Sequence, residues 1–505
     1  MTAVVVNTQP FFNYKFKSKI KQMESAVSYE KVLNDHVQKE RAAVVLASKT
    51  GELLYDKGIE LVLFRNHLLD RTVSELLNLH DYAKNVVGKE IDVFTSSELA
   101  TEIYNMNLAP AKLDIGKLSA EWISEKEKYA SKRVFLDSKL AGFNVVSNDP
   151  IEPRDVVLYG FGRIGRLAAR ELITQAGKGQ QLRLRAIVTR GATDKDIIKR
   201  AALMKNDSVH GAFKGTVEVD LEKRALVING QIVQMIDAPS PEEVDYTAYG
   251  INNALLIDNT GAFTNRADLS RHLKAKGVER VLLTAPGKEI PNVVYGINQV
   301  ELDLDNENIY SAASCTTNAI SPVLKVINDH LGVVKGHIET VHAYTNDQNL
   351  LDNMHKSSRR GRSAAINMVI TSTGAGSAVT KVIPSLKDKL TANAVRVPTP
   401  NGSLAILNLN VAKKTNIEEI NAMLKDAALN GDLVNQIFYS FDPELVSSDI
   451  IGNTCCSVYD SNATIVSPDQ ENIVLYVWYD NEFGYTKQVI RLAKYITKVQ
   501  RKIYY

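Results

Sequence analysis

The sequence predicts an α/β protein in three parts: an α-helical N-terminal module, a parallel-sheet domain and a second domain of mixed α+β structure. Three observations lead to this prediction. Apolar residues recur at helical spacing through roughly the first 150 residues. A strand pattern, a glycine-rich turn and a helix pattern then follow one another from Asp155 onward. Finally, Cys315 lies among small and hydroxyl residues directly before another helical pattern.

Length and composition set the broad class of the protein. Its 505 residues exceed what one compact core usually holds, so we expect two or three domains. With 45% hydrophobic and 23% charged residues, the composition is that of a globular protein. A net charge of +2 gives no reason to expect a nucleic-acid partner, and the chain has no apolar run of the roughly 18 residues that a membrane span needs.

The cysteine content indicates where the protein works. Three cysteines, two of them adjacent at Cys455 and Cys456, are too few for a disulfide framework and favour a reducing compartment. We expect the adjacent pair to be buried. Residues 1–23 contain lysine but no Asp or Glu, as transit peptides do, yet they lack arginine. We therefore expect a cytoplasmic protein and keep a transit peptide as the alternative.

The N-terminal part, residues 1–150, reads as four helices behind a loose arm at residues 1–20. The expected helices run from a cap at Ser28 to Gly51, from Leu61 to Gly88, from a capping box formed by Thr95 and Glu98, and over residues 119–129. Charged residues in this part fit solvated helix faces, and no catalytic group stands out. We expect a packing or oligomerisation module, with a regulatory or partner-binding role as the alternative.

A nucleotide-binding turn follows the proline-containing linker at residues 148–153. After a strand at residues 155–159 comes the pattern GxGxxG, which then opens a helix. Gly160 permits the tight turn, Gly162 lets the backbone approach a pyrophosphate, and Gly165 lets helix and strand pack closely. The pyrophosphate would lie at the helix N-terminus. The sequence therefore predicts a Rossmann domain that binds NAD or NADP.

The end of the second strand, Leu184–Thr189, bears on which dinucleotide is bound. A Rossmann site usually places an acidic residue here for the ribose hydroxyls, but this chain has Arg190. An arginine can pair with the 2′-phosphate of NADP, whereas the alternative is that Arg190 points into solvent. A shift of the loop could also bring Asp194 or Asp196 back to the ribose.

Cys315 is the candidate nucleophile. Its place at a helix N-terminus favours a thiolate, so we expect a lowered pKa. Twenty-seven residues on, His342 lies in a short strand-like run and supplies a candidate base. A lone cysteine is usually a small buried hydrophobe and a lone histidine is usually structural, but here both lie inside longer motifs.

These motifs resemble phosphorylating glyceraldehyde-3-phosphate dehydrogenase. The matching stretches are GFGRIGR at residues 160–166, SCTTN at 314–318, TVHAYT at 340–345, STG at 372–374 and RVPTPN at 396–401. The resemblance extends from about Val156 to about Ala493, and the helical extension before it has no counterpart in the family core. It implies a Rossmann domain at 151–314 completed by a C-terminal helix at 480–505, and a catalytic domain at 315–479.

The resemblance implies a reaction and the residues that perform it. Glyceraldehyde 3-phosphate would be oxidised with NAD or NADP to 1,3-bisphosphoglycerate, reversibly, through a thiohemiacetal and a thioester on Cys315, as in glycolysis and gluconeogenesis. His342 would be the base. The phosphates would be held by Ser314, Thr316, Thr345, Thr373, Gly374 and Arg396. The cofactor would be held by Gly160, Gly162, Arg163, Ile164, Gly165, Arg190, Thr260, Gly261, Thr284 and Asn481.

Partners and alternatives complete the expectations. The resemblance implies a phosphorylated aldehyde and inorganic phosphate as substrates, a homo-oligomer, usually a tetramer, and no metal. The basic loop at residues 356–362 would fold toward a neighbouring subunit, so it does not indicate nucleic acid. One alternative is an erythrose-4-phosphate dehydrogenase that keeps the same Cys and His. Another is a regulatory or scaffold protein that retains the dehydrogenase fold.

Overall fold

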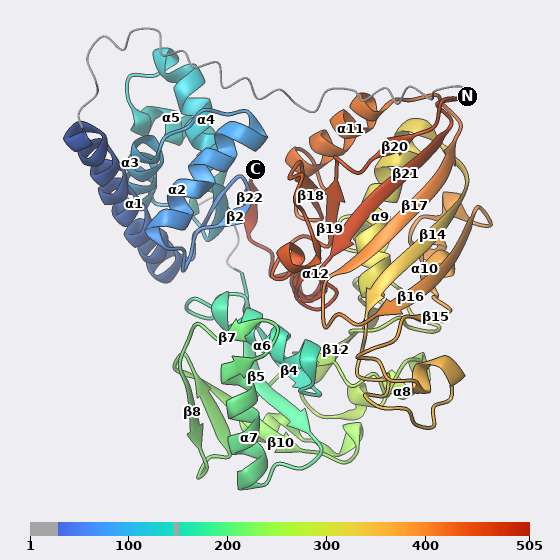
Figure 1. Cartoon of the computed structure of the whole chain (residues 1–505). Helices are drawn as coiled ribbons and strands as arrows, with labels where there is room; N and C mark the ends of the chain where they lie inside the picture. The colour runs from blue at the N-terminus through green and yellow to red at the C-terminus, as the bar shows by residue number, and fades with distance from the viewer. Residues whose placement is uncertain (1–28, 146–150) are drawn as a thin grey trace, which may run out of the picture.

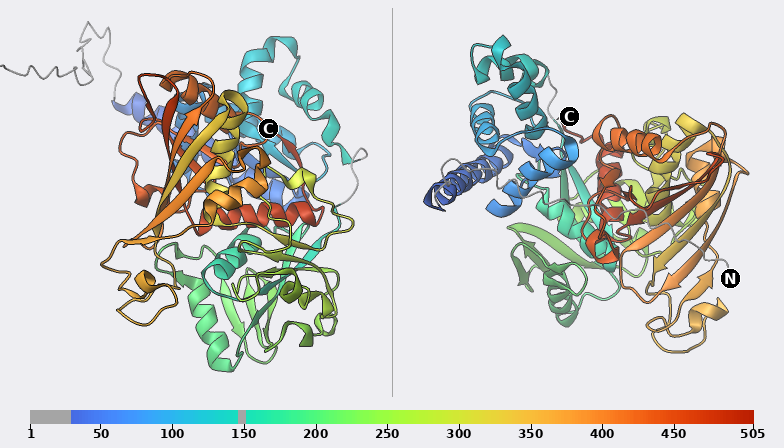
Figure 2. Two further views of the ribbon diagram at one scale, coloured as in Figure 1. Left: turned by 90° about the vertical axis from the view of Figure 1, so that its right-hand side faces the viewer. Right: turned by 45° about the horizontal axis from the view of Figure 1, so that its top comes forward.

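The computed structural model describes residues 29–145 and 151–505. The expected arm at residues 1–20 and most of the linker lie outside the described residues. Figure 1 shows three bodies, each built around its own sheet, with helix α12 (Phe483–Ile496) between them. The turned views in Figure 2 keep this helix at the centre of the molecule. None of the helices in the described ranges is long and apolar enough to cross a membrane.

The N-terminal module is mainly helical but also contains a small sheet. Its helices are α1 (Tyr29–Lys57), α2 (Val73–Tyr82), α3 (Val93–Tyr104), α4 (Ile115–Glu125) and α5 (Lys132–Lys139). Its sheet has the order β2-β1-β3-β22, formed by β2 (Asn66–His67), β1 (Glu60–Leu63), β3 (Ala111–Asp114) and β22 (Lys502–Tyr504). The last strand comes from the C-terminal end of the chain, so the module is completed by residues that follow the catalytic core.

Two sequence predictions in this module are wrong in detail. The helix predicted from Leu61 onward does not begin there, because Leu61 lies in strand β1. The apolar residues between Leu61 and Val87 belong partly to this buried strand and partly to the later helix α2. Helix α3 begins two residues before the predicted cap. Its N-cap is Asp92, whose carboxylate accepts the Thr95 N–H at 2.8 Å, and Thr95 lies in the first turn.

The second body is a doubly wound sheet with the predicted strand-turn-helix start. Its order is β13-β12-β11-β4-β5-β10-β9-β8, parallel from β13 to β10. The strands are β4 (Arg154–Tyr159), β5 (Leu182–Thr189), β8 (Val217–Asp220), β9 (Ala225–Ile228), β10 (Gln231–Asp237), β11 (Ala254–Asp258), β12 (Val278–Leu283) and β13 (Ile309–Ser311). The helices are α6 (Arg163–Thr174), α7 (Asp194–Lys205) and the short α8 (Arg266–Leu269), and β6 (Asn206–Asp207) pairs with β7 (Gly211–Ala212).

The third body is a mixed sheet in the order β15-β16-β14-β17-β21-β19-β18, with β20 added to β21. Its strands are β14 (Val333–Ala343), β15 (Val369–Thr371), β16 (Leu390–Val397), β17 (Ser403–Val411), β18 (Ile437–Ser440), β19 (Ser457–Asp460), β20 (Ile465–Val466) and β21 (Asn472–Tyr479). The helices α9 (Cys315–Leu331), α10 (Ala375–Val382) and α11 (Ile417–Leu429) accompany it. Strand β14 runs parallel to β16 and antiparallel to β17.

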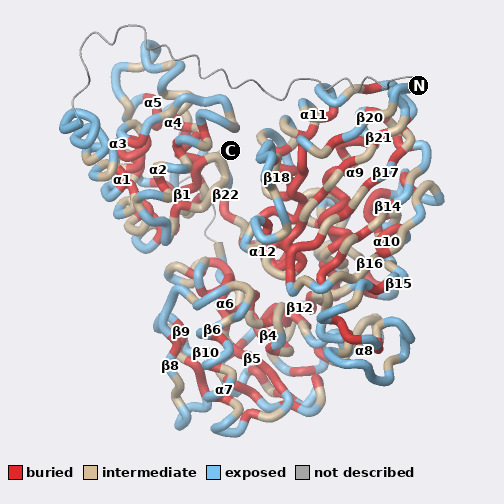
Figure 3. The backbone as a smooth tube through the Cα atoms, viewed as in Figure 1, coloured by how far each residue is buried: buried red, intermediate tan, exposed pale blue. Residues whose placement is uncertain are grey.

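The buried residues fall into separate cores, seen in Figure 3 as red tube inside each body. Helix α12 contributes Val489, Ile490 and Ala493 to the core of the second body, where it packs beside α6. The C-terminal helix therefore returns to that domain as predicted, but it does not extend over 480–505, because residues 502–504 form β22 in the sheet of the N-terminal module. As expected, Cys455 and Cys456 are buried, although their burial says nothing of a chemical role.

Candidate active site

Cys315 is the first residue of helix α9, as the sequence predicted. The helix is capped by Ser314, whose hydroxyl oxygen accepts the Thr317 N–H at 3.0 Å. The Cys315 Sγ lies 3.6 Å from Nε2 of His342, within the distance of a sulfur hydrogen bond. The two residues are therefore brought together from different elements, the start of a helix and the end of strand β14.

Arg396 completes this group because its strand lies beside that of His342. The parallel register of β14 and β16 pairs His342 with Arg396 directly. The Arg396 Nη1 lies 2.7 Å from His342 Nδ1 and donates to the Ala343 carbonyl at 2.8 Å. Since Nδ1 is also 2.7 Å from that carbonyl, it either accepts from Arg396 or donates to Ala343, depending on the tautomer.

The environment keeps both reacting groups neutral. Burial raises the pKa of the Cys315 thiol, and this outweighs the opposite effects of Arg396 and of hydrogen bonds from Thr316. The expectation of a lowered cysteine pKa is therefore wrong, because desolvation of the half-buried Cys315 outweighs the effect of the helix end. Burial, together with the positive charge of Arg396, lowers the pKa of His342 to about 3. The resting pair is a thiol beside an uncharged imidazole, which can accept the thiol proton.

The hydroxyl groups of the other predicted phosphate-binding residues already have hydrogen-bond partners. The Thr316 hydroxyl lies 3.0 Å from that of Tyr479. Thr345, just beyond β14, donates its hydroxyl to the carboxylate of Asp347. The Thr373 hydroxyl accepts the Ala375 N–H at 3.2 Å, at the start of α10. Gly374 is the N-cap of α10, and the space where its Cβ would stand is open.

Arg360 is a residue of this site that sequence reasoning missed. Its guanidinium pairs with Asp347 and is close enough to contribute to the lowered pKa values of both His342 and Arg396. The signal in the sequence is the basic loop at residues 356–362, which the family resemblance assigns to a subunit contact. Arg360 adds a second positive charge near the predicted phosphate position, so the site is suited to a substrate with anionic groups.

The glycine-rich turn has the shape that a dinucleotide needs. Gly160 has a φ of +94°, and a Cβ there would lie 2.9 Å from Thr260 Cγ2. A Cβ on Gly165 would lie 2.4 Å from the Gly160 carbonyl oxygen, which explains the close packing of strand and helix. Gly162 is the N-cap of α6 and faces open space. A cavity of about 390 Å³ adjoins these residues, so the site fits the cofactor.

Comparison with known proteins agrees with this geometry. A family model described as "Glyceraldehyde 3-phosphate dehydrogenase, NAD binding domain" matches residues 154–266, and one described as "Glyceraldehyde 3-phosphate dehydrogenase, C-terminal domain" matches residues 314–481. A "Glyceraldehyde-3-phosphate dehydrogenase-like protein" of Pseudomonas aeruginosa is 48% identical over 88% of this chain and 96% of its own length. The chain belongs to the glyceraldehyde-3-phosphate dehydrogenase family. It is an oxidoreductase that uses NAD or NADP.

The relatives also bear on the N-terminal module. The glyceraldehyde-3-phosphate dehydrogenase of Clostridium pasteurianum is 39% identical over 68% of this chain and 99% of its own length. Glyceraldehyde-3-phosphate dehydrogenase 1 of Bacillus subtilis is 40% identical over 68% of this chain and 98% of its own length. The match to the Pseudomonas protein covers 88% of this chain. It therefore includes part of the N-terminal extension, which these shorter relatives lack.

The cavity beside the dehydrogenase's glycine-rich turn is basic at the end of β5. Both Arg190, after β5, and Arg200, on α7, line the cavity of about 390 Å³. Arg190 is exposed, and no described side chain forms an ion pair with it. Arg200 donates to the Arg190 carbonyl at 3.3 Å, and its buried Nε has no partner among the described residues. Asp196 is engaged as a helix cap with Thr193 and lines no part of this cavity.

The remaining predicted cofactor residues have diverse positions. The side chain of Arg163 is paired with Asp207 at 2.9 Å and with Glu482 at 2.5 Å, so it joins α6 to the start of α12. Ile164 packs against the core. Thr260 lines the cavity, Gly261 has a φ of +67°, and Thr284 donates to the Asp258 carbonyl at 3.0 Å.

Asn481 lies next to the reacting pair through one shared hydroxyl. Ser403, fully buried at the start of β17, donates to Asn481 Oδ1 at 2.7 Å. The same hydroxyl oxygen accepts the Ala343 N–H at 3.1 Å, directly after His342. Ser403 therefore fixes the Asn481 amide relative to strand β14. No group of His, Cys, Asp and Glu side chains in the described ranges is arranged to hold a metal ion.

Proposed function

We propose that this enzyme catalyses the reversible, phosphorylating oxidation of glyceraldehyde 3-phosphate to 1,3-bisphosphoglycerate, with NAD or NADP. The observation that carries this proposal is the contact of 3.6 Å between Cys315 Sγ and His342 Nε2, with Arg396 2.7 Å from the other ring nitrogen. A nucleophile, a base and a cation for a phosphorylated substrate thus meet at one point. The reaction serves glycolysis in one direction and gluconeogenesis in the other.

In the first half-reaction, a carbon–sulfur bond forms and the aldehyde is oxidised. His342 accepts the thiol proton while Cys315 attacks the aldehyde carbon, and the proton passes to the carbonyl oxygen to give a thiohemiacetal. Because its pKa is lowered, the imidazole is uncharged before the reaction, so a ring nitrogen is free to accept the proton. It then takes the hydroxyl proton as the carbonyl re-forms in a thioester. The dinucleotide, when bound, supplies the hydride acceptor.

In the second half-reaction, inorganic phosphate attacks the thioester, and the carbon–sulfur bond breaks. The sulfur of Cys315 leaves and recovers a proton from His342. We assign the substrate's phosphate to Thr345 and Arg396, with Arg360 adding positive charge. We assign the attacking phosphate to Ser314, Thr316, Thr373 and Gly374. Arginine supplies a fork of donors, whereas hydroxyl and backbone N–H groups each supply one.

Cofactor binding is assigned to the glycine-rich turn and the strand ends around it. Gly160, Gly162 and Gly165 would admit the pyrophosphate at the start of α6, and Asn481 would hold the nicotinamide amide. Arg190 and Arg200 favour a 2′-phosphate at the ribose, so we propose that the enzyme accepts NADP at least as well as NAD.

Assembly and location follow from two further features. The segment between β14 and β15, with the start of β15, exposes a group of large apolar residues: Leu350, Leu351, Met354, Ile366, Met368 and Ile370. Apolar patches of this kind mark contact surfaces, so we propose that it joins copies of the chain in a homo-oligomer, a tetramer by family likeness. We place the enzyme in the cytoplasm, because its nucleophile must remain a free thiol.

A substrate comparison tests the proposal. Purified enzyme should reduce NAD or NADP with glyceraldehyde 3-phosphate only when inorganic phosphate is present, and Cys315→Ser should abolish turnover. Faster turnover with erythrose 4-phosphate, or turnover that does not depend on phosphate, would assign the enzyme to the related sugar-phosphate dehydrogenases. No turnover with either aldehyde would favour a regulatory or scaffold role.

A further inference from the structure

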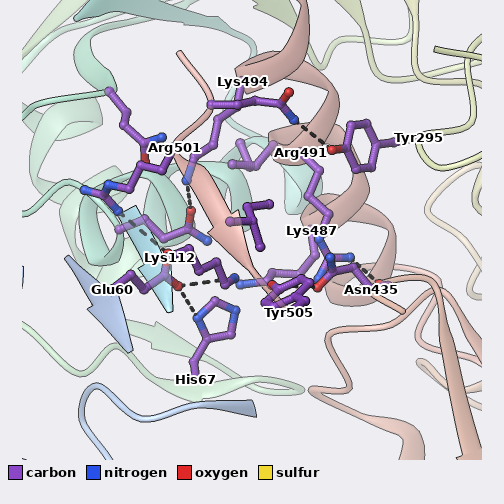
Figure 4. Close-up of a pocket in the computed structure, with 15 residues that line it drawn as sticks. Glu60, His67, Lys112, Tyr295, Asn435, Lys487, Arg491, Lys494, Arg501 and Tyr505 are labelled. Carbon is purple, nitrogen blue, oxygen red and sulfur yellow. Dashed lines mark hydrogen bonds and ion pairs between the residues drawn. The ribbon is translucent and has the colours of Figure 1, made fainter. Parts of the chain in front are cut away.

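A small internal cavity lies where the N-terminal module meets the dehydrogenase core. Its volume is about 80 Å³, and its walls come from all three bodies of the molecule. The module contributes residues of β1, β2 and β3 to the walls (Figure 4). The core contributes residues of helix α12, of the end of α6 and of the loop before β5, and the C-terminal segment closes the cavity. The cavity is separate from the Cys315 site, and none of the residues assigned to catalysis lines it.

The walls of this cavity carry an excess of positive charge. Five cationic side chains and one carboxylate line it: Lys112, Lys487, Arg491, Lys494, Arg501 and, as the carboxylate, Glu60. Glu60 is shared, because Lys112, Arg501 and His67 all lie within 3.7 Å of it. Glu171, just outside, neutralises Lys487 at 2.5 Å. A backbone carboxylate oxygen of Tyr505, the last residue of the sequence, accepts from Lys117, which lies outside the cavity lining.

Two of the cations have only uncharged partners. Lys494 donates to the amide oxygen of Gln175 at 2.6 Å, and Arg491 donates to the carbonyl oxygens of Asn435 and Thr454 at 2.7 and 3.1 Å. Burial lowers the pKa of Lys494 to about 7, and the nearby charges of Arg501 and Lys112 act in the same direction although Glu60 opposes them. Partly buried positive charge without a counter-ion in contact is costly, which points to a missing negative group at these walls.

Arg501 supplies donors that nothing in the described protein uses. Its side chain is 4% exposed, and it touches Glu60 only through Nη1 at 3.7 Å. Its Nε and Nη2 are buried and have no hydrogen-bond partner among the described residues. Buried guanidinium donors are normally satisfied, so this pair is available to a ligand in the cavity. An arginine fork beside a lysine is the arrangement that recognises tetrahedral oxyanions.

We propose that this cavity is a binding site for inorganic phosphate, held by Arg501 and Lys494 with Lys112 and Arg491 around it. The size agrees, because one water needs about 10–15 Å³ of such space, so a cavity of about 80 Å³ has room for the oxygens of one small oxyanion. A groove of about 420 Å³ between the module and α6 shares Glu60, Lys487 and Arg501 with the cavity and gives access to it. The ion would act as a bridge that joins the module to helix α12.

Crystallography on the full chain tests the location directly. Crystals grown without phosphate or sulfate should be soaked in selenate, a tetrahedral analogue whose selenium scatters anomalously. We expect an anomalous peak within hydrogen-bond distance of Arg501 and Lys494, besides any peaks at the Cys315 site. A cavity without a peak in crystals whose Cys315 site is occupied would overturn the proposal.

Thermal unfolding with inorganic phosphate separates this site from the catalytic one. Phosphate should raise the unfolding midpoint of the full-length enzyme. In Lys494→Met, the phosphate concentration that gives half of this rise should be at least tenfold higher, the effect of a lost charge-assisted hydrogen bond. Lys498→Met is the matched control, since Lys498 lies on the same segment, 61% exposed, paired with Asp305 outside the cavity. Arg501→Lys keeps the charge but loses the fork, so it should weaken binding without loss of the fold.

The identity of the anion is tested in the same experiment. Glycerol 3-phosphate should give a smaller increment that depends on Lys494 than phosphate does, because its carbon chain has to extend out of the cavity of about 80 Å³. An increment from phosphate that is equal in Lys494→Met, Arg501→Lys and Lys498→Met would show that the ion binds elsewhere and would reject the site. In the absence of phosphate, Lys494→Met should unfold no earlier than the natural enzyme, since it removes a buried, unpaired charge.

Discussion

At the scale of single residues, the reactive cysteine is governed by burial more than by its helix. Cys315 begins α9, where the backbone N–H groups favour a negative charge, yet its pKa is raised. Desolvation disfavours the thiolate by more than Arg396 and Thr316 recover. In the proposed mechanism, the thiolate of Cys315 therefore forms by proton transfer to His342 when the substrate arrives.

This arrangement predicts the pH dependence of cysteine alkylation. Iodoacetamide should modify Cys315 and leave the buried Cys455 and Cys456 intact in the folded enzyme. Because the pKa is raised, the rate should still be increasing above about pH 8.5, the value of an ordinary cysteine. Arg396→Leu should move the profile to still higher pH, since the positive charge of Arg396 lowers the pKa. A rate that levels off near pH 6 would contradict the neutral pair.

Arg396 also predicts a selectivity for phosphorylated substrate. Arg396→Leu should lower kcat/KM for glyceraldehyde 3-phosphate by roughly ten- to hundredfold, because one charge-assisted contact contributes about 1.5–3 kcal/mol. The loss with unphosphorylated glyceraldehyde should be much smaller. Steady-state kinetics with both aldehydes measure the difference, and an equal loss on both would mean that Arg396 serves only to hold His342.

The cofactor preference is a further prediction at this scale. Arg190→Ala should weaken NADP binding by about ten- to hundredfold and leave NAD binding unchanged, since only NADP carries the 2′-phosphate. Arg200→Met should have a similar but separate effect, because Arg200 lines the same cavity. Kinetics with both dinucleotides check this. Lys195→Met, an exposed residue on α7 that does not line the cavity, serves as the control. A natural enzyme that strongly prefers NAD would refute the role of Arg190.

Sequence reasoning found the residues whose motifs are local and missed those that depend on the folded chain. Cys315 and His342 were predicted because each lies within a continuous motif. Arg360 and Ser403 were missed because their roles arise from the meeting of separate strands and loops. The direction of the cysteine pKa shift was mistaken for the same reason, since burial is a tertiary property.

At the scale of elements, local periodicity predicted the existence of helices better than their starts. The helix at α3 was expected from a capping box at Thr95, but Asp92 offers its carboxylate one turn earlier and accepts two hydrogen bonds from Thr95 at 2.8 Å. Strands β1 and β22 were missed because each is short and pairs with β3, which lies far away from both in the chain. A strand of three residues leaves no periodic pattern to detect.

The cap of α3 gives a prediction at the scale of this element. Asp92→Ala should destabilise the helix start by about 1 kcal/mol, because it removes the acceptor for the Thr95 N–H. Glu98→Gln, at the other member of the box expected from sequence, should change the helix start little, since Glu98 forms only a surface pair with Lys132. Hydrogen exchange of the α3 amides in the two variants distinguishes the caps, and a larger effect of Glu98→Gln would reject Asp92.

At the scale of the whole molecule, the N-terminal module is a body with its own core and a polar junction. Its buried cluster draws on residues 43–143, with Tyr504 the residue from the C-terminal end that packs against it. The clusters of the core contain no residue before Ile151. Contacts across the junction include an Arg65 hydrogen bond to the Ala428 carbonyl and the stacking of Tyr82 on Phe438, with ring centroids 6.4 Å apart.

This separation predicts that the catalytic core survives removal of the module. The short chain should contain residues 151–501. It omits β22 as well as the module, because β22 pairs with β3 of the module and would otherwise be left without a partner strand. It should fold, retain the alkylation profile of Cys315, and expose Lys494 and Arg491 to water, because the module walls of the cavity are gone. Phosphate should then no longer stabilise it through Lys494, so Lys494→Met in the short chain should leave the midpoint shift unchanged. Circular dichroism, alkylation and thermal unfolding check these outcomes together.

A short chain that is insoluble, while the full-length enzyme is active, would show that the module completes the fold of the core or an interface between subunits.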